Sequence, residues 1–139
     1  MKPKVIIDTN ILFSVLLSKE NRYKFILFSK NIEFYTCNCN FLFVEIFKHK
    51  NKIQNISNLN EDEILSQLET ILSKITFIKE ELIPKEIFNK AYLLTKDIDE
   101  KDTPFAALSI FLNGLLLTGD KKLKNHLKQK GFNNFYELG

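Results

Sequence analysis

Four acidic residues stand where the sequence around them is otherwise apolar or turns sharply. Asp8 ends the run KVIID near the start of the chain, and Asp120 follows the run LLLTG. Glu45 lies inside the apolar stretch FLFVEIF, and Asp102 directly precedes TPFAALSIFLN. A buried carboxylate without a partner is costly, so each acid needs a local role or a shared ligand. If the four converge, they repel one another unless a hard divalent cation such as Mg²⁺ or Mn²⁺ binds among them.

Each acid also has a local structural explanation, which the sequence leaves open. Asp102 is a suitable N-cap for the segment that follows it, and Asp120 suits a turn or the cap of a lysine-rich helix. Glu45 can extend into solvent or pair with Lys48 about one turn later. Asp8 is the hardest to explain locally, because it ends an apolar run that is expected in the middle of a sheet.

The elements that would position these acids alternate along the chain. Short apolar runs predict strands at residues 4–8, 33–37, 75–78 and 115–117. Helical spacing of apolar residues predicts helices that begin near residues 10, 22, 41, 61, 85, 103 and 121. This order favours an α/β fold, with a parallel sheet covered by helices on both faces. In such a sheet, ligands bind at the carboxyl ends of the strands, where Asp8 and Asp120 would stand.

Boundary signals refine this outline. Asn38 or Asn40 could cap the helix that contains Glu45. Residues 51–59 read as a loop, followed by an Asn60 and Glu63 pair that resembles a capping box. We also expect Pro84 in the first turn of one helix, Gly114 at the end of another, and a last edge strand within residues 132–138.

The overall composition indicates one globular domain over residues 1–139. The formal net charge of +3 decides little, but lysines cluster around positions 48–52 and 121–130. Such clusters suit a polyanion such as RNA, or are simply solvated helix faces. Cys37 and Cys39 are too close in sequence for an unstrained disulfide, so we expect reduced thiols. We find neither a signal peptide nor a long apolar span, and we expect a cytoplasmic protein without membrane attachment.

The combination of motifs resembles the PIN domain family. The resemblance rests on four motifs. They are the DTN of residues 8–10, Glu45 in its apolar helix, the DTPFAAL of residues 102–108, and the LTGD of residues 117–120 with Lys122 and Leu123 behind it. The resemblance covers essentially the whole chain. It is greatest to small prokaryotic single-domain members, which include toxins of the VapC type.

This resemblance implies a three-layer α/β/α sandwich and a Mg²⁺- or Mn²⁺-dependent endoribonuclease. Asp8, Glu45, Asp102 and Asp120 match the catalytic and metal-binding acids of the family. The positions that match or would support them are Thr9, Asn10, Asp99 and Thr118. Candidates for contacts with the RNA backbone are Arg22, Lys121 and Lys122. The resemblance further implies a small antitoxin partner and a homodimer.

Other functions are open at this point. A phosphatase of the haloacid dehalogenase type would need a second Asp where Asn10 stands. A phospho-receiver would need an acidic pair on its first strand, which this sequence lacks. A non-catalytic RNA-binding or regulatory module on the same fold is the main alternative, and only metal-dependent turnover separates it from a nuclease.

Overall fold

Four short parallel strands form the centre of the protein in the computed structural model, which describes residues 2–17, 22–37 and 39–137. The strands are β1 (Lys4–Ile7), β2 (Glu33–Thr36), β3 (Ile75–Phe77) and β4 (Leu115–Leu117). They lie in the order β3-β2-β1-β4, and every neighbouring pair is parallel. This sheet confirms the predicted α/β fold and places β1, which leads into Asp8, between β2 and β4.

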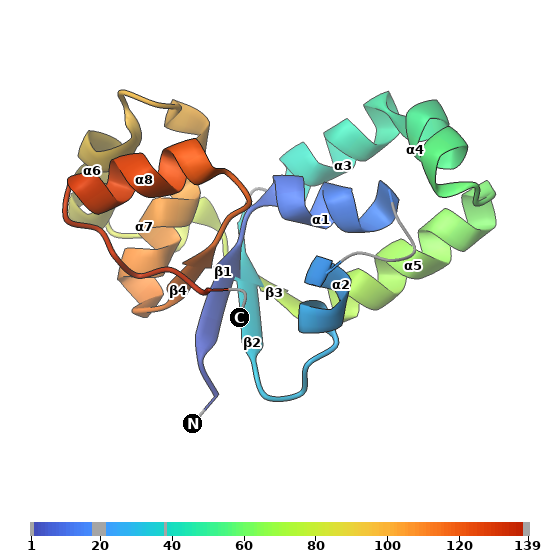
Figure 1. The fold of residues 1–139 in the computed structure, drawn as a ribbon, viewed down its shortest axis with the longest axis horizontal. Coiled ribbons are helices and arrows are strands. Elements are labelled where there is room, and N and C mark those ends of the chain that lie inside the picture. The colour runs from blue at the N-terminus through green and yellow to red at the C-terminus, as the bar shows by residue number, and fades with distance from the viewer. Residues whose placement is uncertain (1, 18–21, 38, 138–139) are drawn as a thin grey trace.

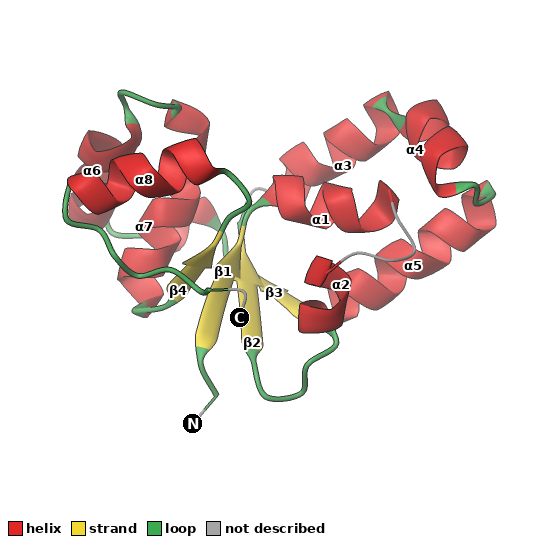
Figure 2. Ribbon diagram, viewed as in Figure 1, coloured by secondary structure: helices red, strands yellow, loops and turns green. Residues whose placement is uncertain are grey.

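Helices cover the sheet on both sides (Figures 1 and 2). One layer contains α1 (Thr9–Leu17), α2 (Arg22–Leu27), α3 (Cys39–Lys48), α4 (Lys50–Ser57) and α5 (Glu61–Ser73). The other contains α6 (Lys85–Thr95), α7 (Thr103–Leu112) and α8 (Lys121–Gln129). Two short 3₁₀ helices, η1 (Glu80–Leu82) and η2 (Glu100–Asp102), flank α6 in the chain. The predicted three-layer arrangement is therefore confirmed.

Alternating side chains of β1 supply both cores. Val5 and Ile7 pack in the cluster shared with α1 to α5, whereas Ile6 packs in the cluster shared with α6 to α8. All three side chains are completely buried. Successive residues of a strand point to opposite faces, so a continuous apolar strand is what a sheet covered on both faces requires.

Most of the predicted boundaries are confirmed within one or two residues. Asn60 and Glu63 form the expected capping box at the start of α5, with bonds in both directions between side chain and backbone. Pro84 directly precedes α6, and its fixed φ suits that position. The predicted start at residue 103 is also the first residue of α7.

Four boundary predictions are wrong or lie outside the described residues. Residues 50–57 form helix α4 rather than a loop, because Ile53 and Ser57 bury one face against the core. The expected last strand is reduced to a single bridge between Leu116 and Phe135. Asn113, with φ 52°, adopts the left-handed conformation that ends α7, one residue before Gly114. Asn40 lies inside α3 and does not cap it, and Asn38 lies outside the described residues.

Cys37 is a free thiol at the end of β2, fully buried. Burial raises its pKa to about 12, and the nearby Glu80 carboxylate adds to that rise. The thiol is therefore protonated and unreactive at neutral pH. In the described ranges, none of the helices has the length and apolar character needed to cross a membrane.

Candidate functional site

Three of the four predicted acids directly precede helices at the carboxyl edge of the sheet. Asp8 joins β1 to α1, Asp120 follows β4 and precedes α8, and Asp102 precedes α7. Helix N-termini carry unpaired N–H groups and a partial positive charge, both of which favour a carboxylate there. The fold therefore concentrates negative charge where the helices offer it some stabilisation.

Asp8 is buried, with only 6% of its surface exposed. Its Oδ1 accepts a hydrogen bond of 2.9 Å from the backbone N–H of Ile11. Burial nevertheless raises the pKa of Asp8 to about 6. The backbone N–H groups of Ile11 and Asn10 oppose that rise, and the Asp120 carboxylate adds to it. Asp8 thus caps α1, but its charged form is less stable in the folded protein than in water.

Asp102 occupies the N-cap position of α7 but does not cap the helix with its side chain. The local explanation offered by the sequence is therefore wrong for this residue. Burial raises the pKa of Asp102 to about 7, and the carboxylates of Asp99, Asp8 and Asp120 push it in the same direction. Asp8, Asp99 and Asp120 are therefore close enough to Asp102 to act on its charge, and the oxygens of Asp102 make no capping hydrogen bond.

Asp120, by contrast, does cap its helix. Its Oδ1 accepts hydrogen bonds from the backbone N–H groups of Lys122 and Leu123, at 3.0 and 3.1 Å. Thr118 supports this turn, because its Oγ1 accepts a 3.1 Å hydrogen bond from the backbone N–H of Asp120. Thr118 therefore stabilises the turn that carries Asp120. Its predicted role beside the acids stays a prediction.

Gly119 completes the same turn under a steric constraint. A Cβ atom added there would lie 2.7 Å from the Tyr23 hydroxyl oxygen and 3.8 Å from its Cζ. Tyr23 belongs to α2 and is 9% exposed, so its ring has little room to move. A packed tyrosine therefore holds the backbone that presents Asp120.

Glu45 lies farther from this group but shares a groove with part of it. The groove has a volume of about 790 Å³, and its lining includes Thr9, Asn10, Glu45, Asp99 and Asp102. Glu45 pairs with His49, which directly follows α3, with 3.3 Å between Oε2 and Nε2, rather than with the expected Lys48. Asp8 and Asp120 are not among the described residues that line this groove, so the prediction that Glu45 joins the other acids stays a prediction.

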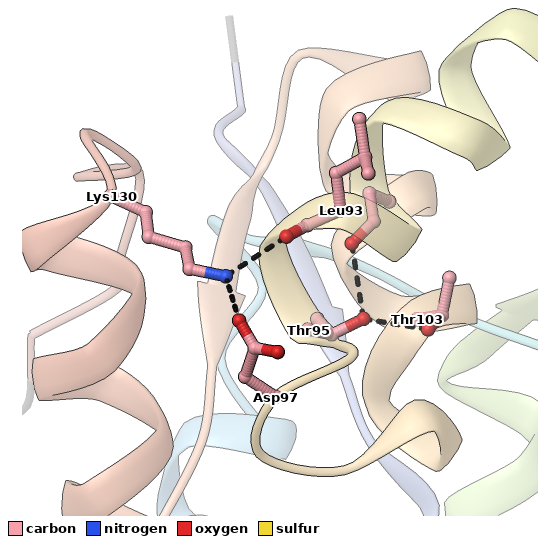
Figure 3. Close-up of polar contacts among 6 residues, drawn as sticks. Leu93, Thr95, Asp97, Thr103 and Lys130 are labelled. Carbon is pink, nitrogen blue, oxygen red and sulfur yellow. Dashed lines mark hydrogen bonds and ion pairs between the residues drawn. The ribbon is translucent and has the colours of Figure 1, made fainter.

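Two contacts fix the loop that carries Asp99 and Asp102 (Figure 3). The hydroxyl oxygens of Thr95 and Thr103 lie 2.6 Å apart, and both residues are buried. Thr95 also donates to the carbonyl of Ala91, at 3.0 Å, so Thr103 is the donor between the two hydroxyls. The end of α6 is thereby tied to the start of α7.

Lys130 provides the second contact. Its Nζ lies 2.9 Å from the carbonyl oxygen of Leu93 and 2.9 Å from Oδ2 of Asp97. This ammonium group lowers the pKa of Asp97. Within the loop, Oδ1 of Asp99 accepts a hydrogen bond from the N–H of Lys101. The sequence does not single out Thr95, and it does not show the contacts that Thr103 and Lys130 make, because a Thr or Lys that bonds across the fold has no local pattern.

The chemistry of the donors fits a hard divalent cation, since carboxylate oxygens at a sheet edge are the usual ligands of Mg²⁺ and Mn²⁺. Across the described ranges, however, no three His, Cys, Asp or Glu side chains are close enough to form a metal site. Asp8, Asp99 and Asp120 thus act on the charge of Asp102, but the described residues form no ready-made set of metal ligands. Thr9 is buried and Asn10 is exposed on the groove beside them.

The lysines of α8 divide into two groups. Lys124 and Lys128 pair with Glu137, at 2.6 and 3.8 Å, and Lys130 pairs with Asp97. The part of the lysine cluster near the C-terminus is therefore largely neutralised within the protein. Lys121 and Lys122 form the exposed first turn of α8, immediately after Asp120. The side chain of Arg22, the third predicted backbone contact, lies outside the described residues.

We expect Asp8→Asn to stabilise the protein at pH 7.5 in EDTA. The raised pKa means that the folded state holds this proton more tightly than the unfolded state, so the penalty is present above about pH 6 and is lost below the ordinary pKa of 3.8. Asn retains an oxygen that can accept from Ile11. The gain should be on the order of 2 kcal/mol at pH 7.5 and should vanish near pH 4. Urea unfolding at both pH values measures it.

The matched control for that experiment is Glu69→Gln, which removes an exposed carboxylate from α5. This variant should change the free energy of unfolding by less than about 0.5 kcal/mol. A destabilised Asp8→Asn protein at pH 7.5 would contradict the conclusion that burial and repulsion penalise this charge.

The contact between Gly119 and Tyr23 predicts a coupled pair of substitutions. Gly119→Ala should cost about 1–3 kcal/mol, because the new methyl group overlaps the tyrosine hydroxyl. In a Tyr23→Phe background the same change should cost clearly less, since only the 3.8 Å contact with the ring remains. A double-mutant cycle by urea unfolding isolates this coupling from other effects of losing the hydroxyl. Equal costs in the two backgrounds would refute the steric constraint.

Comparisons with known proteins give the same fold. The sequence matches the PIN domain model over residues 6–132. A comparison with curated proteins finds no significant match. A solved structure of PAE2754 from Pyrobaculum aerophilum is 12% identical with a TM-score of 0.58, and the alignment covers 89% of this chain and 79% of that one.

Two further solved structures are similar. A toxin–antitoxin complex from Klebsiella pneumoniae includes a chain 18% identical with a TM-score of 0.55, covering 85% of this chain and 88% of that one. VapBC-1 from nontypeable Haemophilus influenzae is 16% identical with a TM-score of 0.56, covering 91% and 93%. At these identities the structures show the fold alone. Because the family match spans most of the chain and includes all four predicted acids, this chain belongs to the PIN domain family.

Proposed function

We propose that the protein is a Mg²⁺- or Mn²⁺-dependent endoribonuclease. The observation that carries this proposal is the carboxyl group of Asp102, which does not cap its helix and whose charged form is destabilised first by burial and then by three other carboxylates. A fold gains nothing in stability from such an arrangement, so a ligand that requires it is the simplest explanation. Membership of the PIN domain family supports the same conclusion.

The roles follow from the positions of the side chains. Asp8, Asp102 and Asp120 would hold one or two ions, with Glu45 directly or through water, and Asp99 in a secondary role. A bound ion would supply an activated water and would offset the negative charge that develops on the phosphoryl oxygens. Thr9, Asn10 and Thr118 would keep the acids in place. Lys121, Lys122 and Arg22 would contact RNA phosphates.

A non-catalytic RNA-binding module is the second candidate. The absence of a preformed metal cage among the described residues is the observation that favours it. The two candidates differ in turnover, because a binding module would retain RNA without cleaving it.

Cleavage of RNA should require both the metal and Asp102. The purified chain should cut labelled RNA with Mn²⁺ or Mg²⁺ and should be inactive in EDTA. Asp102→Asn keeps the shape of the side chain but removes a charged ligand, so the rate should fall by at least about a hundredfold. Gel electrophoresis of the labelled products measures this. Asp62→Asn, which removes an exposed acid from α5, should leave the rate unchanged.

Metal-independent cleavage, or equal rates for the wild type and Asp102→Asn, would contradict the proposed mechanism. Binding of RNA without any cleavage would instead favour the binding module. Circular dichroism of each variant shows whether a lost activity reflects lost folding.

We further propose that the chain is the toxin of a toxin–antitoxin pair, since two of the similar structures are a toxin–antitoxin complex and VapBC-1. Wild-type expression should then arrest bacterial growth, whereas the Asp102→Asn variant should not. A small antitoxin protein would block the groove, with a basic side chain against the acids.

A homodimer is the other assembly that we propose, and an apolar surface on the α3–α5 side supports it. Phe47 is 80% exposed and Leu65 is 52% exposed, and both line one small cavity. Lys50 and Glu61, whose side chains pair at 2.6 Å, line the same cavity. A surface with apolar groups and both signs of charge can match a rotated copy of itself, as a two-fold interface requires.

Phe47→Glu should therefore convert a dimer into a monomer. Placing a carboxylate in an apolar interface costs several kcal/mol, because the charge loses water without gaining a partner. Light scattering after size-exclusion chromatography measures the mass. Leu82→Glu, at a 63% exposed position in η1, is the matched control and should leave the dimer intact. A wild-type chain that is monomeric at high concentration would refute this assembly.

A further inference from the structure

Glu45 differs from the other predicted metal ligands in its place on a helix. Asp8 and Asp120 directly precede helices, and backbone N–H groups of the first turn bond to Oδ1 of each. Glu45 instead lies in the last turn of α3 (Cys39–Lys48). Backbone N–H groups there are paired within the helix, and the negative end of the helix dipole disfavours a carboxylate. A donor for this carboxylate therefore has to come from a side chain.

His49 provides a donor at the right spacing. It directly follows α3, and its backbone N–H continues the helical pattern by donating to the carbonyl of Glu45 at 3.0 Å. Residues four apart lie on the same side of a helix, and Nε2 of His49 lies 3.3 Å from Oε2 of Glu45. His49 is also the N-cap residue of α4, but its side chain makes no capping hydrogen bond. Its ring therefore faces Glu45 rather than the start of α4.

Phe13 fixes the orientation of the His49 ring. The two rings meet edge to face, with centroids 5.9 Å apart and planes at 75°, a geometry that aromatic rings favour. Phe13 belongs to α1, which lies beside α3 (Figure 1) and which Asp8 caps. Phe13 also packs against the core, so its position is fixed. The helix that Asp8 caps thus holds the side chain that faces Glu45.

We propose that His49 is a positioning residue for Glu45. Its Nε2–H group holds Oε2 and leaves Oε1 for a divalent cation, just as backbone N–H groups hold Oδ1 of Asp8 and Asp120. This inference rests on the proposed function and assigns a residue that sets the metal affinity of the site. A distance of 3.3 Å is long for a hydrogen bond, but such bonds are often long before a ligand binds and shorten afterwards.

His49 is not itself expected to bind the ion. Among the described residues, Glu45 lines the groove and His49 does not. Imidazole nitrogen suits zinc, copper and nickel, whereas Mg²⁺ and Mn²⁺ prefer oxygen ligands. The side chains of His49 and Glu45 are 41% and 31% exposed, and exposed pairs contribute little to stability. A substitution of His49 should therefore alter the site without unfolding the protein.

The experiment measures Mn²⁺ binding without RNA, by electron paramagnetic resonance, which detects the free ion. His49→Leu should raise the dissociation constant about tenfold or more, as the loss of an outer partner of a metal ligand commonly does. His49→Gln keeps an N–H donor at a similar distance from the backbone and should stay within about threefold of the wild type. Urea unfolding of each variant shows whether the fold is retained.

Lys48→Gln is the matched control. It removes a full positive charge next to His49 at an exposed position, yet Glu45 pairs with His49 rather than with Lys48. Its affinity for Mn²⁺ should equal that of the wild type. In a Glu45→Gln background, His49→Leu should have little further effect, because the carboxylate that His49 positions is gone.

Equal Mn²⁺ affinity of the wild type and His49→Leu would overturn the proposal. So would a His49→Gln variant as weak as His49→Leu, because an amide cannot replace a ring nitrogen that binds the ion itself. A wild-type chain that binds no Mn²⁺ would refute both this inference and the proposed function. Metal-dependent cleavage with unchanged Mn²⁺ affinity in His49→Leu would refute the positioning role and retain the nuclease. Mn²⁺ binding that depends on His49, in a chain that never cleaves RNA, would retain the positioning role and refute the nuclease.

Discussion

Burial of carboxyl groups at the carboxyl edge of the sheet, together with repulsion among them, is the constraint on which the arrangement of this protein depends. Asp8, Asp102 and Asp120 lie far apart in the sequence, directly before α1, α7 and α8. The fold brings the starts of these helices to one edge of the parallel sheet. The starts of α1, α7 and α8 offset part of the repulsion, because helix N-termini favour negative charge. The pKa values of Asp8 and Asp102 nevertheless remain raised to about 6 and about 7, first because the groups are buried and second because other carboxylates repel them.

Carboxyl groups that destabilise one another stay close together only if the surrounding structure prevents them from moving apart. The ends of β1 and β2 are joined by a hydrogen bond from the Thr36 hydroxyl to the carbonyl of Ile7, directly before Asp8. On the other side of the sheet, the bond between Thr95 and Thr103 fixes the start of α7. Buried hydrogen bonds are stronger than exposed ones, so these ties are well placed to resist electrostatic strain.

Local signals in the sequence were sufficient for the strands and for most helix boundaries, because apolar runs and capping residues act within a few positions. They failed where distant packing decides the outcome. The sequence of α4 is polar on average, which predicts a loop, yet Ile53 packs one face of this helix in the core. The segment around Phe135 carries a strand-like pattern but has only one bridge, with Leu116.

The same limit applies to the candidate site. Sequence motifs indicated which acids are present and that they lie near the sheet edge, but not how each is held. Asp120 and Asp102 read alike as caps before helices, and only the structure shows that the first caps and the second does not. That difference matters, because the capping hydrogen bonds to Oδ1 fix the orientation of Asp8 and Asp120 and leave only Oδ2 for a ligand. Asp102 makes no such capping bond, so its carboxyl group is the one that can rotate without losing a hydrogen bond, while those of Asp8 and Asp120 are held in place.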